Sequence, residues 1–133
     1  DAIAALEPVL STWSPESEIS RINARPWAER KELPLSATLG TLLRQGLRWR
    51  TATRGAFDCY AGDAIALWRA AVKEGKEPDA AALAPLAQAA ASGPGYSIVR
   101  RKVGKDSVDL LTCDRAGTFN IDGLAKGMII DQA

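Results

Sequence analysis

The apolar residues change their spacing about two-thirds of the way along this 133-residue chain. Before that point they recur every three or four residues, which predicts helices. After it, "YSIVRRKV" (96–103) and "DSVDLLT" (106–112) are strand-like, and Gly104 and Lys105 between them predict a hairpin turn. "GTFNI" (117–121) is expected to form a third strand. The sequence therefore predicts an α+β fold in which helices pack on a small antiparallel sheet.

The helical part divides into several segments. Residues 1–13 have an apolar stripe at helical spacing, with Pro8 inside it, and the pair Ser14–Pro15 predicts the start of a second helix that ends at Asn23. The first stripe consists of Ile3, Leu6, Val9, Leu10 and Trp13.

Two N-caps and two glycines are expected to bound the later helices. Ser36 should cap a helix that ends before Gly55, and Asp79 should cap an Ala-rich helix that ends before Gly93. The stripe of the Ser36 helix consists of Leu39, Leu42, Leu43, Gly46, Leu47 and either Trp49 or Arg50. A further helix between these two should end near Lys73.

Composition excludes several functions. A net charge of +1 gives no reason to expect a nucleic-acid partner, and no apolar run approaches the roughly 20 residues of a membrane helix. The absence of histidine excludes a Ser-His-Asp triad or a histidine-based zinc site within the chain. The two cysteines, Cys59 and Cys113, allow one disulfide, but two free thiols fit the sequence equally well.

The most informative stretch is "TFNIDGLAKGMIIDQA" (118–133). A strand, a Gly-x-x-Lys-Gly turn and the start of a helix would direct backbone N–H groups at an anion, and Lys126 would add a positive charge. The pattern lacks the glycine spacing and the Ser or Thr of a P-loop. A tight turn with a solvated lysine is the alternative.

Three other groups of residues could carry chemistry. In "GAFDCYAGD" (55–63), aromatic residues flank Asp58 and could line a ring-binding cleft; alternatively Phe57 fills the core and Asp58 caps the next helix. In "STWSPESEISRIN" (11–23), polar side chains and Trp13 could surround a planar ligand, or they could simply cap helices. The third group, Asp106, Asp109 and Asp114, is interpreted as charges on the solvent face of the sheet rather than a metal cluster.

In this order, three blocks resemble the ApbE family of FAD:protein FMN transferases. "LSTWSPESEISRIN" (10–23) is similar to the family's Ser-x-aromatic segment that ends in Ser-Arg-hydrophobic-Asn, and "GAFDCYAGDAIALW" (55–68) to its Gly-Ala-Phe-Asp block. "FNIDGLAKGMIIDQA" (119–133) is similar to its Gly-x-Ala-Lys-Gly-x-x-x-Asp block. The resemblance covers nearly the whole chain and makes it the N-terminal portion of an ApbE-like domain, spanning residues 1–133.

The resemblance implies a Mg²⁺-dependent reaction that splits FAD and attaches FMN to a Thr or Ser hydroxyl of a partner protein. It implies cofactor contacts from Trp13, Phe57, Asp58, Asp122, Gly123, Lys126, Gly127 and Asp131. The backbone carbonyl of Ala125 would contact the metal. Trp13 would stack on a ring, Phe57 and Asp58 would lie on the adenosine side, Lys126 would contact phosphate or flavin, and Asp131 would orient the helix. The family also implies a location facing the periplasm, often through a lipid anchor.

The chain departs from the family pattern at several positions. Asp122 replaces a glycine of the family's Asp-x-Gly-Gly, Cys59 replaces a proline, and Met128 replaces an aromatic residue. A carboxylate beside a pyrophosphate would repel it unless it points away or holds the metal. The family's later His-x-x-Asp-Pro and Asp-Ala-x-x-Thr segments do not occur in residues 1–133, so this portion by itself is expected to be inactive. The alternatives are an FAD pyrophosphatase, a flavin-binding module without transfer activity, or a structural domain without a ligand.

Overall fold

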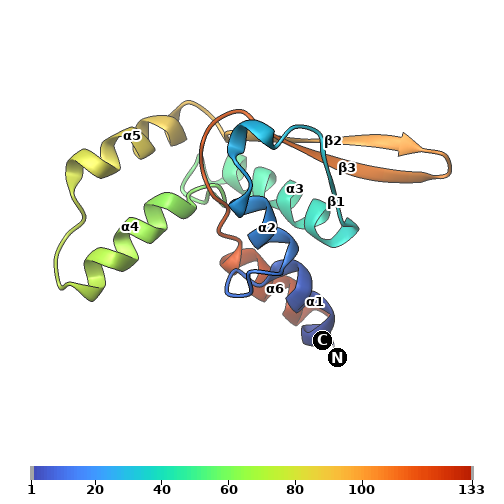
Figure 1. Ribbon diagram of the computed structural model, residues 1–133, viewed down its shortest axis with the longest axis horizontal. Helices are drawn as coiled ribbons and strands as arrows, with labels where there is room; N and C mark the ends of the chain where they lie inside the picture. The colour runs from blue at the N-terminus through green and yellow to red at the C-terminus, as the bar shows by residue number, and fades with distance from the viewer. Residues whose placement is uncertain (1, 133) are drawn as a thin grey trace.

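The computed structural model describes residues 2–132, including their side chains except those of Ala2, Ile3, Ile129 and Gln132. It shows an α+β fold, as predicted, in which helices pack around a small antiparallel sheet (Figure 1). The helices are α1 (Ala2–Leu10), α2 (Glu18–Ala24), α3 (Ala37–Ala52), α4 (Gly62–Lys73), α5 (Ala80–Ala91), α6 (Asp122–Gln132) and the 3₁₀ turn η1 (Trp27–Glu29). The strands are β1 (Leu33–Leu35), β2 (Tyr96–Val103) and β3 (Asp106–Cys113). None of the described helices is long and apolar enough to cross a membrane.

The sheet has the order β1-β3-β2. β2 and β3 form the predicted hairpin, and Gly104 adopts the positive φ of +63° that its turn requires. The prediction of a third strand at 117–121 was wrong, because β1 occupies that place beside β3. Residues 117–121 are held by contacts outside the sheet instead: the Asn23 side chain of α2 bonds both backbone groups of Phe119, at 2.8 and 3.0 Å.

Side-chain caps explain where α2, α3 and α5 begin. Ser36 and Asp79 accept backbone N–H bonds at the starts of α3 and α5, as predicted. The predicted start of α2 at Ser14–Pro15 was wrong, because Ser17 caps α2 and its hydroxyl accepts from the N–H of Ser20. The stripe that was expected to extend to Trp13 is also shorter, since α1 ends at Leu10. Its first member, Ile3, has a side chain outside the described part.

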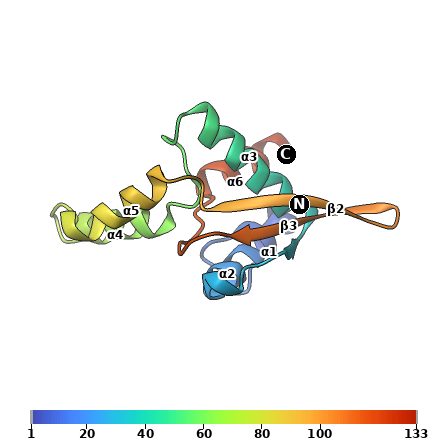
Figure 2. The same ribbon diagram turned by 90° about the horizontal axis from the view of Figure 1, so that it is seen from above.

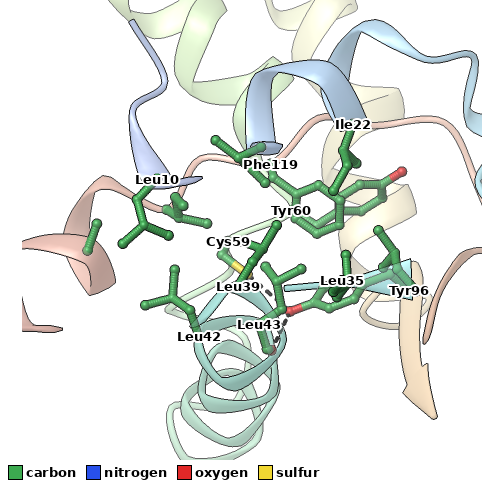
Figure 3. Packing of buried hydrophobic residues seen from close by; sticks show 14 of the residues in the cluster. Leu10, Ile22, Leu35, Leu39, Leu42, Leu43, Cys59, Tyr60, Tyr96 and Phe119 are labelled. Atoms are coloured by element: carbon green, nitrogen blue, oxygen red, sulfur yellow. Dashed lines mark hydrogen bonds between the residues drawn. The ribbon is translucent and has the colours of Figure 1, made fainter. Parts of the chain in front are cut away.

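The core lies around α3, between the sheet and the helices α1, α2 and α6 (Figures 1 and 2). Its largest fully buried side chains are Ile19, Leu39, Leu42, Leu43, Leu111 and Ile121. Three aromatic rings meet at its centre: Tyr60 and Phe119 lie 4.6 Å apart, and Tyr96 and Phe119 lie 5.0 Å apart, between ring centroids. Figure 3 shows the Tyr96 hydroxyl beside Cys59; it donates to the carbonyl of Leu43 at 3.1 Å.

The burial of Asp109 corrects the sequence analysis, and the state of the two cysteines completes it. Asp109 is not a solvent-face charge but is 4% exposed, and it pairs with Arg100 at 3.2 Å and Arg44 at 3.5 Å. Asp106 and Asp114 are exposed, as predicted. Cys59 and Cys113 are both buried free thiols, which settles the question that the sequence left open.

Helices α4 and α5 form an arm that extends away from the rest of the molecule in both views (Figures 1 and 2). They pack mainly on each other, and Tyr60 and residues 115–117 also line the small cavity of about 290 Å³ between them. The arm meets the rest of the molecule at the start of α4, where the N–H of Gly62 donates to the carbonyl of Thr118 at 3.0 Å. We call this contact between Gly62 and Thr118 the joint. This joint brings α4 beside the segment that leads into α6.

Candidate functional site

The site begins at the start of α6, and here the sequence analysis needs a correction. Gly123 and Gly127 were expected in a turn, but both lie inside the helix, which begins at Asp122. Asn120 causes the early start, because its side chain accepts from the N–H of Asp122 at 3.2 Å. The carbonyl of Ile121 then accepts from the next turn of the helix. Two glycines four residues apart share one helix face, so that face lacks side chains.

This glycine face forms one wall of an open groove of about 950 Å³ between α3 and α6. A Cβ atom at Gly123 would come within 3.7 Å of the Phe57 ring, and at Gly127 none of the described atoms would lie within 4 Å. Its other lining side chains include Arg48, Trp49, Phe57, Met128 and Asp131. A flat helix face opposite aromatic side chains suits a planar ring. The groove therefore brings together four predicted site residues: Phe57, Gly123, Gly127 and Asp131.

Phe57 satisfies both interpretations of its block, because it packs against the core cluster and also lines the groove. Asp58 satisfies neither. Its carboxylate, 7% exposed, pairs with Arg50 at 3.2 Å and accepts from the N–H of Tyr60 at 2.9 Å, while the N-cap of α4 is Ala61. Arg50 also donates to the carbonyl of Ala90 at 2.5 Å. Asp58 therefore fixes the loop and, through Arg50, the end of α5.

Trp13 lies in a separate recess rather than in the groove. Its side chain is 84% exposed, beside the face of α4 that carries Trp68, Arg69 and Val72. The recess has a volume of about 520 Å³ and an almost wholly apolar lining. Arg69 connects this recess to the start of α6, because it pairs with Asp122, the residue before Gly123.

Asp122 lines neither the groove nor the recess, but its carboxylate bonds to residues at the edge of the recess. Its carboxylate accepts from the Thr12 hydroxyl at 2.9 Å and pairs with Arg69 at 3.4 Å. Arg69 and the N-terminal end of α6 both place positive charge beside this carboxylate. Asp122 therefore has partners in the protein and lies at the helix end where an anion was predicted to bind.

The remaining predicted residues are placed as follows. Lys126 is exposed, lines neither recess and makes no ion pair with any described residue. Ala125 is 8% exposed and belongs to the core cluster. Among the described residues, His, Cys, Asp and Glu form no group of three that could hold a metal. Mg²⁺ usually takes one or two protein ligands together with waters and substrate phosphates, so the predicted contact from the Ala125 carbonyl stays a prediction.

Sequence reasoning missed three residues that line these recesses, Trp49, Trp68 and Arg69, and also Thr12, which donates to Asp122. Trp49 or Arg50 was expected in the buried stripe of α3, but Trp49 is 55% exposed at the groove and Arg50 turns inward to Asp58. The available signal for Trp49 was a large aromatic residue near the end of an amphipathic helix, with no predicted packing partner. Thr12 and Arg69 have no local signal, because they meet only through tertiary contacts with Asp122.

The chain is thus an α+β protein with an open groove lined by aromatic side chains and by the glycine face of α6. Structural comparison finds the same fold in the crystal structure of the Pseudomonas stutzeri flavinyl transferase ApbE in its apo form, with a TM-score of 0.67. The alignment has 24% identity and covers 98% of this chain and 40% of that one, so this chain spans well under half of the relative's length. The ApbE family model matches residues 1–133, and the chain belongs to this family. A search among curated proteins gave no significant match.

Proposed function

We propose that this chain is part of a domain that transfers FMN from FAD to a Thr or Ser hydroxyl of a partner protein in a Mg²⁺-dependent reaction. The observation that carries the proposal is the match of the ApbE family model over the whole chain. The name of the structural neighbour, a flavinyl transferase, agrees with it. The cleft is compatible in shape, since a planar ring fits between the glycine face of α6 and the aromatic residues of α3 and the following loop.

The reaction would exchange the phosphoanhydride bond of FAD for a phosphoester bond to the acceptor. The acceptor hydroxyl oxygen attacks the FMN phosphorus, the bond from that phosphorus to the bridging oxygen breaks, AMP leaves, and the hydroxyl proton passes to solvent. Within this chain, Phe57 and Trp49 would hold one ring in the groove and Trp13 would cover another. Lys126, with its free ammonium group, would contact a phosphate of FAD. Mg²⁺, when bound, would offset the negative charge of the pyrophosphate, and this chain would contribute the backbone carbonyl of Ala125 to it.

A second candidate, FAD hydrolysis or FAD binding without transfer, is favoured by one observation. Asp122 places a carboxylate where the motif of the family has a glycine, at the start of the helix nearest the groove. If water replaced the acceptor hydroxyl, the same cleavage would release free FMN and AMP.

The test uses the complete natural chain that contains residues 1–133, incubated with FAD, Mg²⁺ and candidate acceptor proteins. AMP release is measured by chromatography and acceptor mass by mass spectrometry. AMP release with an acceptor heavier by one FMN supports transfer, and AMP with free FMN supports hydrolysis. FAD binding without AMP supports a binding module, and no binding contradicts all three.

Single substitutions then locate the contacts. Lys126→Ala should weaken FAD binding about tenfold, because a charged hydrogen bond to phosphate contributes about 1.5 kcal/mol. The matched control is Lys105→Ala in the hairpin turn, an exposed lysine of the same size. Unchanged FAD affinity in Lys126→Ala would remove Lys126 from the site.

We further propose that the protein acts on the periplasmic side of the membrane, as the family resemblance suggests. Cell fractionation of the natural host tests this proposal. Recovery of the protein in the cytoplasmic fraction would contradict it.

A further inference from the structure

We propose that Asp122 is a positioning residue that holds together the two walls of the Trp13 recess. One wall is the loop of residues 11–17, which carries Trp13, and the other is the face of α4 that carries Trp68. The two oxygens of the Asp122 carboxylate divide between them: Oδ1 accepts from Thr12 at 2.9 Å and Oδ2 meets the guanidinium of Arg69 at 3.4 Å.

The remaining hydrogen bonds of the loop show why this link matters. Ser17 and Ser20 both donate to the carbonyl of Ser11, at 2.6 and 3.2 Å, and Ser14 donates its N–H to the Ser11 hydroxyl at 3.2 Å. These bonds close the loop onto itself and onto the start of α2. Among the described hydrogen bonds, Thr12–Asp122 is the one that joins the loop to α6.

The wall on α4 needs the same support, because the arm packs mainly on itself. Arg69 and Asp122 are separated by 53 residues in sequence, and their ion pair joins the middle of α4 to the first residue of α6. A single carboxylate thus sets the spacing between Trp13 and Trp68. Both indole side chains are more than half exposed, at 84% and 51%, so they do not hold this spacing by burial in the core.

This inference rests on the proposed function for its effect on ligand binding, but its structural part can be tested separately. If Trp13 covers a ring of FAD, loss of the Asp122 link should weaken FAD binding through Trp13 alone. The carboxylate bonds to Thr12 and Arg69 and does not line the groove or the recess, so it need not touch the ligand.

The first measurement is amide hydrogen exchange of residues 11–17 in the complete natural chain. Asp122→Ala and Thr12→Val should each raise the exchange rate there by about three- to tenfold, the loss of one charged hydrogen bond in a partly exposed site. Asp122→Asn keeps an acceptor for Thr12 and should restore most of the protection. Glu16→Ala is the matched control, because it removes an exposed ion pair with Arg21 from the same loop without touching α6. Unchanged exchange in Asp122→Ala would overturn the proposal.

The second measurement is the Kd of FAD by flavin fluorescence. Asp122→Ala should weaken binding about three- to tenfold in the wild-type background and cause no further loss in a Trp13→Ala background. An equal loss in both backgrounds would show that Asp122 acts on the ligand directly, and would overturn the positioning role. If the wild type binds no FAD while the exchange result holds, the proposed function fails and the link between the walls stands.

Discussion

The core around α3 and the arm of α4 and α5 are stabilised in different ways. In α3 five residues are buried, and Leu39, Leu42 and Leu43 are fully so. In α4 only Ala71 is buried among the described residues, and α5 buries none. The core therefore owes its stability to apolar burial. The arm depends instead on a few hydrogen bonds and ion pairs with the rest of the molecule. Because the arm carries Trp68 and Arg69, one wall of the Trp13 recess lies on the part of the molecule that should open most easily.

The largest effect is expected in the core. Leu39→Ala should lower the free energy of unfolding by about 3 to 5 kcal/mol, because it leaves a cavity in a site that is 0% exposed. Denaturant unfolding monitored by circular dichroism measures the change, and Leu39→Val, with a loss of about 1 kcal/mol, provides a folded variant. A loss below about 1 kcal/mol for Leu39→Ala would contradict the assignment of α3 as the centre of the core.

The buried thiol of Cys59 should make the core sensitive to alkaline pH. Burial is the main cause that raises the pKa of this thiol from 9.0 to about 11, and the Asp58 charge adds to the rise while the hydrogen bond to Tyr96 opposes it. Between these values the unfolded chain loses the proton and the folded chain keeps it, so stability falls as pH rises above 9. The full loss is about 2 to 3 kcal/mol by pH 11.

Unfolding free energies measured from pH 7 to 11 test this slope. Burial also raises the pKa of Tyr96, which steepens the loss at the upper end. Cys59→Ala removes the titrating group and should show a shallower fall over the same range. An identical slope in that variant would show that the thiol does not contribute.

The joint between core and arm should tolerate no added side chain. A Cβ at Gly62 would lie 2.4 Å from the Thr118 hydroxyl and 2.8 Å from its carbonyl oxygen. Gly62→Ala should therefore displace the arm and cost about 2 kcal/mol, the usual cost of overpacking. Gly75→Ala, between the arm helices, is not a neutral control because its φ is +66°, so Gly127→Ala, where the added Cβ has space, is the better one for stability. Equal stability of Gly62→Ala and the wild type would contradict the claim that Gly62 and Thr118 leave no space for a side chain.

The smallest effect is expected inside the arm. Leu86→Ala should cost about 1 kcal/mol, because Leu86 is only half-buried beside the small cavity between α4 and α5. Amide exchange should then rise in the arm and stay unchanged in α3. A loss as large as that of Leu39→Ala would erase the distinction between the two regions.

Local sequence patterns correctly predicted the features that depend on a residue and the backbone within a few positions of it. The N-caps Ser36 and Asp79 and the hairpin turn at Gly104 were read correctly, because each depends on one or two adjacent residues. The third strand was misplaced, since "GTFNI" has strand-like residues but its hydrogen bonds go to the Asn23 side chain from another part of the chain. The start of α2 was misplaced by three residues because both Ser14 and Ser17 are acceptable caps.

The sequence by itself determined the α+β class, the hairpin, the start of α3 and the set of blocks that place the chain in its family. Tertiary structure alone decided which site residues meet. Phe57 joins Gly123 and Gly127 at the groove, whereas Asp122 turns to Thr12 and Arg69, 110 and 53 residues away. The reason is physical: a cap or a turn is fixed by bonds within a few residues, but the partner of a carboxylate is whichever donor the packed helices bring within about 3 Å.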